Sequence, residues 1–534
     1  MPAITPSGRK QVHSLIYFLS LCVLVMAMPY SRYIATLSLI FLIVNWVSEG
    51  NLGNRLKVFA ADRAALAFTL MYAVNLAGLA WSDNPGFGIS NDLLHKSPTL
   101  FLPLILVTTP LPGPRRIKIL IWLFIGAVTA VSFAGLLIRI IKPMATWRDA
   151  SPFIPGVYYG NLLLLAAFQV PLLLRKMKAG KKALLAGAAL SAWLIFFLFY
   201  TRTLTGIASL AGVILYIHII LIARIRSLAL KGSIALAAII LLAIATKPVI
   251  DIYRETHHES ENGIISLKTH TAAGNPYSHD TTSVLRENGN LVYIDICDLE
   301  LSEAWAGRSS LDYEGLTTES THLKSVLLRY MASRNLTKDA EGLGMLSDED
   351  IEAVENGFTN YLNVSRPGVY VRIYEELRGL YLYREVGYQH GLASSFTERI
   401  DQWRAALQAF RAKPWFGWGT GSIFTAMNYG FEKNGSILAG SEMKSHNQYL
   451  YIMINTGIAG LVSYIILYTF FVIRSGVGRE VMFKIFLLTF LINFLANNSY
   501  ESQLGQNPFV FFSLFYCYFY PFIEGKTLKD AVST

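Results

Sequence analysis

The sequence predicts an all-α polytopic membrane protein with about 12 transmembrane helices and one large, mainly helical loop domain, with some β-structure, between spans 9 and 10. Of its 534 residues, 53% are hydrophobic and only 15% are charged, which is typical of a membrane protein. Residues 247–445 contain 19 Lys+Arg and 27 Asp+Glu (net −8), whereas the remainder contains 27 and 9 (net +18). This partition indicates basic membrane-flanking loops beside an acidic soluble segment, and it argues against a nucleic-acid partner.

Twelve apolar segments approach or reach the roughly 17–25 residues that span a bilayer. They lie near residues 12–29, 32–48, 64–81, 98–111, 117–138, 158–174, 183–200, 203–222, 230–249, 449–472, 482–498 and 506–523. The fourth is short and contains Pro103 and Pro110.

The distribution of basic residues predicts the orientation of these spans. With the N-terminus inside, the inner segments carry 21 Lys+Arg and the short outer loops carry 6. Basic residues favour the cytoplasmic side. We therefore expect both termini to be cytoplasmic and the long loop to face outward.

The chain is predicted to form three parts: a membrane domain over 1–249, a loop domain over 250–445, and a second membrane domain with a cytoplasmic tail over 446–534. A loop of that length is too long to be a simple connector.

Local patterns predict several elements within the loop. Residues 291–296 alternate like a strand, and Ser347 has the sequence context of a helix cap. Helices are expected over 368–388 and 398–412.

The helix predicted over 398–412 has an apolar stripe formed by Ile400, Trp403, Leu407 and Phe410, with Arg404 and Arg411 along one edge. An amphipathic helix on the bilayer with snorkelling arginines is the favoured interpretation. The alternative is a guanidinium clamp for a diphosphate, because the arginine fork matches phosphate oxygens.

A glycine-rich turn follows at Gly417, Gly419 and Gly421. Such glycines allow the backbone to approach a ligand closely, although a plain surface loop is the commoner outcome.

His446 lies just before the tenth span. Ser445-x-x-Gln448 matches a capping box, which places His446 in the first helical turn. A helix N-terminus disfavours imidazolium, so the ring would stay neutral and able to accept a proton. A polar residue at headgroup level is the alternative interpretation.

Arg202 occupies a tight outer turn between two spans, as an interfacial anchor or as a ligand for an anionic lipid-linked substrate. Arg148, in the outer loop 139–157, is a weaker candidate of the same kind. Neither Asp298-x-Glu300 nor His257-His258 makes a convincing metal motif, so we expect no metal and no cofactor.

Three motifs together resemble the O-antigen ligase and polymerase superfamily. They are Thr201-Arg202-Thr203, Glu398…Trp403-Arg404…Pro414…Gly417…Gly419, and Ser445-His446-Asn447-x-Tyr449-Leu450…Gly457-x-x-Gly460-Leu461. The resemblance covers roughly residues 185–470 and agrees with the span layout, although the loop is longer than in typical members.

The resemblance implies a GT-C type glycosyltransferase of the bacterial inner membrane that acts at the periplasmic face. It implies metal-independent, inverting transfer of an undecaprenyl-diphosphate-linked glycan to an acceptor, with lipid A–core favoured. Arg202 and Arg404 would hold the diphosphate and His446 would act as the base or orient the acceptor hydroxyl. Further substrate-binding candidates are Arg399, Arg411, Arg148, Asn447 and Tyr449.

Other functions stay open at this point. A polymerase would transfer the glycan to another lipid-linked repeat, and a protein O-oligosaccharyltransferase would transfer it to protein. A lipid-linked glycan transporter is the non-enzyme alternative, because 12 spans is also a common transporter count. The uneven division of the spans, nine and three, and their scarcity of ionisable residues count against transport.

Overall fold

The computed structural model describes residues 6–141, 151–258, 267–283, 285–388 and 394–524. The chain divides into two compact units. The first comprises residues 1–138, 148–219 and 399–534, and the second comprises 139–147 and 220–398. The predicted loop segment 250–445 is thus shared between the units, with its last part, 399–445, in the first.

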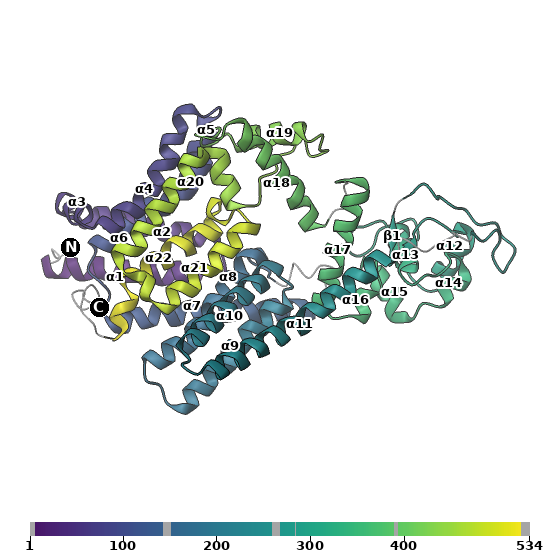
Figure 1. The fold of residues 1–534 in the computed structure, drawn as a ribbon, viewed down its shortest axis with the longest axis horizontal. Helices are drawn as coiled ribbons and strands as arrows, with labels where there is room; N and C mark the ends of the chain where they lie inside the picture. Colours follow the sequence, from purple (N-terminus) through teal and green to yellow (C-terminus); the bar gives the residue numbers. More distant parts are fainter. Residues whose placement is uncertain (1–5, 142–150, 259–266, 284, 389–393, 525–534) are drawn as a thin grey trace, which may run out of the picture. The chain divides into compact units, whose positions relative to one another are not determined.

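The first unit is built almost entirely of helices (Figure 1). Apart from a few terminal residues, they are α1 (Pro6–Ala27), α2 (Arg32–Glu49), α3 (Leu52–Ala61), α4 (Arg63–Gly78), α5 (Pro85–Phe87), α6 (Leu94–Thr108), α7 (Pro114–Ile141), α8 (Gly156–Lys176), α9 (Lys181–Tyr200), α10 (Leu204–Arg224), α18 (Ser395–Ala412), α19 (Ile423–Lys433), α20 (Gln448–Ser475), α21 (Val481–Ala496) and α22 (Gln503–Tyr518). Short turns η2 (Gly88–Leu93) and η5 (Ser499–Glu501) precede α6 and α22.

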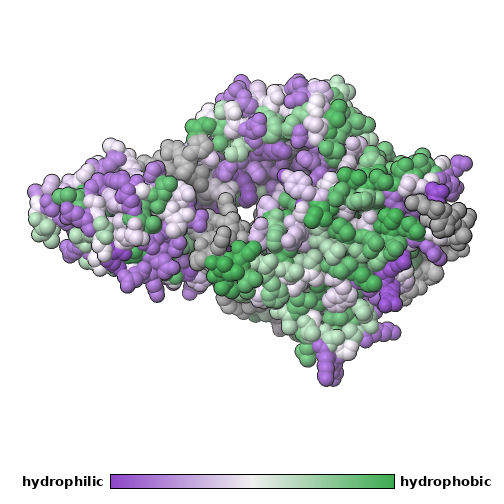
Figure 2. Space-filling view, turned by 180° about the vertical axis from the view of Figure 1, so that it is seen from behind, coloured by the Kyte–Doolittle hydropathy of each residue, from purple (hydrophilic) through white to green (hydrophobic). Residues whose placement is uncertain are grey.

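Within the described residues, eight helices are long and apolar enough to cross a membrane: α1, α2, α4, α7, α8, α9, α10 and α20. The other four predicted spans fall on α6, α11 (Leu228–His258), α21 and α22. An all-α polytopic membrane protein is therefore confirmed, and the count of twelve spans stays a prediction. Figure 2 shows apolar residues gathered over the surface of this helical part.

Contacts between the short connecting segments agree with the predicted alternation of sides. Lys176 and Glu480, from two segments predicted to lie inside, are 3.4 Å apart. Lys96 and Glu501, from two segments predicted to lie outside, are 2.7 Å apart. Which side is periplasmic stays a prediction.

The second unit contains α11, a two-stranded antiparallel sheet and six further helices in its described residues. The elements after α11 are β1 (Arg286–Glu287), β2 (Asn290–Leu291), α12 (Asp298–Ala306), α13 (Leu323–Ser333), α14 (Ala340–Gly344), α15 (Asp348–Glu355), α16 (Leu362–Ser365) and α17 (Gly368–Val386). A core around Trp305, Leu327 and Tyr330 joins α12 to α15. A smaller cluster packs Ile252 of α11 against Leu362 of α16 and Val371 of α17.

Two predictions for this unit have opposite outcomes. The Ser347 cap is confirmed, because its side chain accepts from the Asp350 amide and Asp350 completes the capping box. The strand over 291–296 is wrong beyond Leu291, since β2 is only two residues long. Residues 293–296 instead bond to separate segments: the Tyr293 carbonyl accepts from Asp280 and the Asp295 carbonyl accepts from Lys338. An alternating apolar and polar sequence pattern forms a strand only beside a continuous partner strand, and the pattern itself does not provide one.

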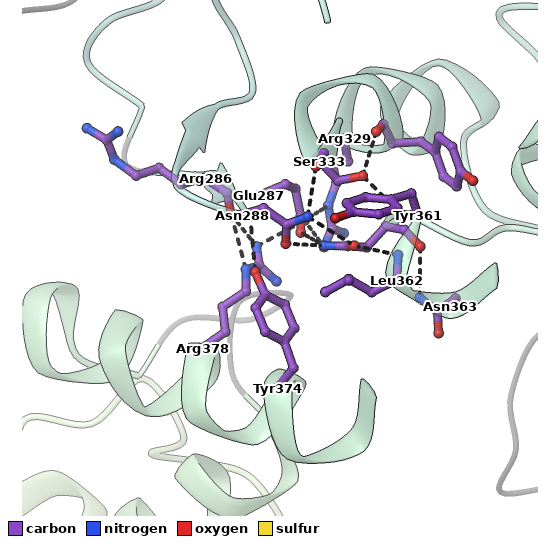
Figure 3. Close-up of polar contacts among 12 residues, drawn as sticks. Arg286, Glu287, Asn288, Arg329, Ser333, Tyr361, Leu362, Asn363, Tyr374 and Arg378 are labelled. Carbon is purple, nitrogen blue, oxygen red and sulfur yellow. Dashed lines mark hydrogen bonds and ion pairs between the residues drawn. The ribbon is translucent and has the colours of Figure 1, made fainter. Parts of the chain in front are cut away.

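A buried carboxylate joins three elements of the second unit (Figure 3). Glu287 of β1 has a side chain only 1% exposed. Its Oε1 lies 2.7 Å from Arg329 of α13 and 3.0 Å from Arg378 of α17, and its Oε2 accepts from Asn360 at 3.1 Å. Two guanidinium groups and one amide thus compensate the cost of burying this charge.

In the first unit, α20 is broken at Gly457, where φ is 67° and ψ is −169°. The break frees backbone groups on both sides, and the segment between α18 and α19 satisfies them. The carbonyls of Ile454 and Asn455 accept from the amides of Trp418 and Gly419 at 2.7 and 2.9 Å. Non-helical backbone in a membrane helix needs such partners.

The exchange also runs in the other direction. The amides of Ile458 and Ala459 donate to the carbonyls of Pro414 and Trp415 at 2.9 and 3.2 Å. The segment 414–419 therefore pairs with the broken helix much as a neighbouring strand would.

The glycine-rich turn is not a surface loop. Its backbone is covered by other segments of the chain and so is not open to a ligand. Gly417, Gly419 and Gly421 are buried and have φ of 72°, 97° and 99°. A Cβ on Gly417 would lie 2.4 Å from the Ile454 carbonyl oxygen. Gly417 thus allows the loop to meet the α20 backbone directly, whereas a Cβ on Gly419 or Gly421 would meet the backbone of Ser82 or of Asn84 and Gly88.

We expect Gly417→Ala to unfold at a clearly lower temperature than the parent. Its Cβ would combine a disfavoured φ with a backbone clash, costing about 2–5 kcal/mol. Gly435→Ala is the control, because Gly435 has φ 62° and no atom within 4 Å of an added Cβ. It should cost only about 1–2 kcal/mol. Thermal unfolding of the full chain in detergent measures both, and equal losses would contradict the proposed pairing.

Candidate active site

His446 precedes α20 and lies outside its first turn. The helix begins at Gln448, and its N-cap is Asn447, whose side chain accepts from the Leu450 amide at 3.1 Å. The predicted Ser445 capping box is therefore wrong. The Ser445 hydroxyl instead donates to the Asn447 carbonyl at 3.0 Å. Asn447 competes well for the cap because its amide oxygen reaches the free helix amides.

The Gln448 side chain does not complete a capping box with Ser445 and instead contacts η5. Its amide nitrogen donates to Glu501 at 2.8 Å, and its amide oxygen accepts from the Tyr500 amide at 2.9 Å. The start of α20, two residues after the half-buried His446, is thereby fixed to η5.

Two of the three predicted catalytic residues have left-handed backbone. His446 has φ 44° and Arg202 has φ 50°. Such a conformation costs a residue other than glycine or asparagine about 1–2 kcal/mol, and it persists where surrounding contacts impose it. This strain is a structural reason to examine both positions as functional ones.

Arg202 follows the last turn of α9. Its amide donates to the Phe199 carbonyl at 3.0 Å, and the flanking hydroxyls of Thr201 and Thr203 are 3.0 Å apart. Glycine is the usual residue at such a helix end. Arginine therefore occupies a position where its backbone is unfavourable.

The turn at Arg202 and the segment at His446 border the same end of α21. From the α8–α10 side, Asn493 donates to the Val157 carbonyl at 3.1 Å, and a Cβ on Gly212 would touch Ile492. From the other side, Asn447 donates to the Leu495 carbonyl at 2.9 Å and Tyr449 to the Leu491 carbonyl at 3.1 Å.

Asn447 and Tyr449 therefore have structural partners. Asn447 caps α20 and anchors it to α21, and the Tyr449 hydroxyl adds a second anchor. A substrate contact by either side chain remains a hypothesis.

Helix α18 carries three of the predicted arginines. Arg404 and Arg411 are exposed and Arg399 is half-buried. Arg148 lies outside the described residues. The exposure of Arg404 and Arg411 on one helix is compatible with either a clamp or an interfacial role.

The buried side of α18 differs from the predicted apolar stripe. Ala405, Ala406 and Ala409 are fully buried, whereas Leu407 is 39% exposed. A Cβ on Gly430 of α19 would lie 2.0 Å from the Ala405 carbonyl oxygen. Small residues let the two helices approach closely, so the larger apolar residues are left at the edge of the contact.

Helix α18 also holds the segment that leads to His446. Asp401 accepts a hydrogen bond from the Ser436 hydroxyl. The Gln402 amide lies 3.9 Å from the Met443 sulfur. Arg404 and His446 are therefore carried by segments that contact each other.

The structure adds a buried charged cluster that the sequence analysis did not identify. The Lys96 ammonium lies 2.7 Å from Glu501, and both side chains are 2% exposed. Lys96 also donates to Asn75 at 2.8 Å. Because Glu501 accepts from Gln448, this ion pair supports the start of α20.

Asp92 of η2 extends the cluster to the glycine-rich turn. One of its carboxylate oxygens accepts from the Gly421 amide at 2.9 Å, and the other accepts from the Tyr451 hydroxyl at 3.0 Å. The sequence signal that could have revealed this cluster was the presence of acidic and basic residues in short loops beside apolar segments. Nothing in the sequence paired them.

A second histidine also lies near the segment that precedes His446. His95 is half-buried at the start of α6, outside the predicted span 98–111. Burial lowers the pKa of its imidazole, and the positive charge of Lys444 lowers it further. His95 is therefore neutral near pH 7 and is a candidate that the motifs did not single out.

Residues 355–465 match a family described as O-antigen ligase. This supports membership of the O-antigen ligase-like family. The matched segment covers about a fifth of the chain and includes α18, the glycine-rich turn, His446 and the break in α20. No curated protein matches the chain.

The match supports an O-antigen ligase-type function in a broad sense, and with it a glycosyltransferase-like enzyme. Such a function implies a lipid-linked glycan and an acceptor as partners. The long apolar helices of the described residues indicate a multi-pass membrane protein.

The Lys96–Glu501 pair should behave as a buried unit. Lys96→Met or Glu501→Gln alone leaves an uncompensated charge, which should cost about 3–5 kcal/mol. The double variant removes both charges, and the glutamine introduced by Glu501→Gln still offers an acceptor to Gln448, so much of the loss should be recovered.

The matched control is the Lys176–Glu480 pair, whose side chains are 21% and 30% exposed. Lys176→Met should cost less than about 1 kcal/mol. Thermal unfolding of the parent, the two single variants, the double variant and Lys176→Met measures these losses of stability. Additive losses at positions 96 and 501 would contradict the coupling.

Proposed function

We propose that this protein transfers a glycan from an undecaprenyl-diphosphate carrier to lipid A–core at the periplasmic face of the bacterial inner membrane. The observation that carries the proposal is the family match over 355–465, because that segment contains Arg404 and His446. The enlarged loop accords with a bulky acceptor.

The proposed reaction is a metal-independent GT-C type transfer with inversion. The acceptor hydroxyl attacks the anomeric carbon while the bond from that carbon to the diphosphate oxygen breaks. Arg202 and Arg404 stabilise the negative charge that develops on the leaving diphosphate. His446 takes the proton from the acceptor hydroxyl or orients it.

Several features support these assignments. Arg404 is exposed on α18, where a membrane-bound donor can reach it. The Lys96–Glu501–Gln448 contacts hold the start of α20 rigidly beside His446. A positioned base needs such support, because small displacements of a catalytic group reduce rates strongly.

The deciding measurement is a transfer assay in membranes, with purified undecaprenyl-diphosphate glycan and lipid A–core. We expect the parent to form glycosylated core and His446→Asn to lose at least about 100-fold, since general base catalysis contributes 10²–10⁴-fold. Asparagine accepts a left-handed backbone, so this variant separates the loss of the imidazole from strain.

His218→Ala is the matched control, because the His218 ring bonds to the Ile214 carbonyl of its own helix, α10. It should retain parental activity. Longer lipid-linked chains with bare core would indicate a polymerase, and glycosylated protein would indicate an O-oligosaccharyltransferase. Loss of glycan flipping in His446→Asn would indicate transport.

The clamp assignment makes a separate prediction. Arg404→Lys should lose nearly as much transfer activity as Arg404→Ala, because lysine cannot form the bidentate contact with the diphosphate. Arg116→Lys, at the face predicted to be cytoplasmic, should retain activity. The same assay measures all three, and a fully active Arg404→Lys protein would exclude the clamp.

A further inference from the structure

A cavity of about 730 Å³ lies in the second unit, between α12 and the start of α13 (Figure 1). Residues of α12, the segment 309–314 and Lys324 of α13 line it, and we call it the α12 pocket. Its volume falls within the range of small-ligand sites, roughly 300–1,000 Å³. All of its lining residues precede the segment 355–465 that matches the O-antigen ligase family, so the match assigns this pocket no role.

One wall of the α12 pocket is held in place by an ion-pair network. The Lys324 ammonium lies 3.0 Å from one oxygen of Asp298 and 3.2 Å from Glu314. The Tyr313 hydroxyl donates to the other oxygen of Asp298 at 2.9 Å. Both oxygens of Asp298 are therefore engaged by the protein, and this residue fixes the shape of the wall.

Two other carboxylates keep capacity for a ligand. One oxygen of Asp312 accepts from the Glu314 amide at 3.2 Å, and one oxygen of Glu314 pairs with Lys324. Among the described residues, no hydrogen bond or ion pair engages the second oxygen of either side chain. Both residues are exposed. Each free oxygen can accept hydrogen bonds from hydroxyl groups of a ligand.

The pocket also offers hydroxyl groups and an apolar surface. Ser310 is exposed in the lining, and the neighbouring side chain of Leu299 is 59% exposed. The fully buried Trp305 supports them, and its indole nitrogen donates to the Leu311 carbonyl at 2.9 Å. A few placed polar groups beside apolar ones suit a sugar ring, which has hydroxyl groups at its edge and C–H groups on its faces.

The charge of the pocket selects among ligands that carry hydroxyl groups. Three carboxylates and one ammonium group give the lining a net charge of −2. Like charges disfavour binding, so a diphosphate or a phosphorylated lipid A fits poorly. A metal ion also fits poorly, because no group of three or more His, Cys, Asp or Glu side chains among the described residues is arranged to hold one. An uncharged saccharide fits best.

We propose that the α12 pocket binds an uncharged saccharide of the donor glycan, an inference that rests on the proposed function. Asp312 and Glu314 accept hydrogen bonds from its hydroxyl groups, and Leu299 contacts a face of the ring. The sugars bound here are not the one that reacts, because the reacting sugar carries the diphosphate. Binding energy from such remote parts of a substrate helps to position its reacting centre.

The first test measures binding without transfer. The donor glycan is released from its carrier by mild acid, freed of phosphate and titrated against the full chain in lipid nanodiscs by saturation-transfer difference NMR. Asp312→Asn and Glu314→Gln should each weaken binding at least about fivefold, because a neutral acceptor forms weaker hydrogen bonds than a carboxylate. Ser310→Trp, which fills the pocket, should weaken it at least about tenfold.

Glu349→Gln and Glu303→Trp are the matched controls, because both residues are exposed in the second unit and lie outside the lining. Neither should change the affinity. If Ser310→Trp fails to fold, the two carboxylate variants carry the test. No binding by the parent, or binding that these three pocket variants leave unchanged, would overturn the proposal. Displacement of the glycan by putrescine would indicate a cation site and would overturn it as well.

A second test separates this proposal from the proposed function. In the transfer assay, Ser310→Trp should raise the KM of the donor at least about fivefold and leave the KM of the acceptor unchanged. Glycan binding in the pocket without any transfer by the parent would refute the proposed function alone. Transfer with the same donor KM in the parent and in Ser310→Trp would refute the pocket alone.

Discussion

The backbone exchange between the broken α20 and the segment 414–419 is the constraint on which the candidate site depends. A helix interrupted at Gly457 leaves carbonyls and amides without intrahelical partners, and in a membrane protein these must be satisfied by the chain itself. The loop that supplies them connects α18 to α19. The same hydrogen bonds therefore stabilise the break and fix the helix that carries Arg404.

A second constraint acts at the N-terminal end of α20. Lys96, Glu501 and Gln448 form a buried chain of contacts, and Asp92 ties that region to Gly421. Such polar clusters specify one arrangement when every member is satisfied. The glycine-rich turn, the start of α20 and η5 are thereby held as one platform beside His446.

Local sequence patterns located several elements correctly and misjudged the local structure of others. The spans, the Ser347 cap and helix α18 follow from hydropathy, capping chemistry and period, which act over a few residues. The cap at Ser445 failed because Asn447 was an equally suitable competitor. On α18, the contact buried inside the protein is formed by alanines that face Gly430, because they pack more closely than the larger apolar residues of the stripe.

The sequence by itself determined the all-α polytopic class and the segment in which the family resemblance lies, because apolar length and motif spacing are local properties. Only the tertiary structure decided that the segment 414–419 pairs with a broken helix and that Lys96 meets Glu501. It also decided that α12, the segment 309–314 and Lys324 line one cavity. Each of these joins segments distant in the chain, and hydropathy and spacing contain no information about such partners.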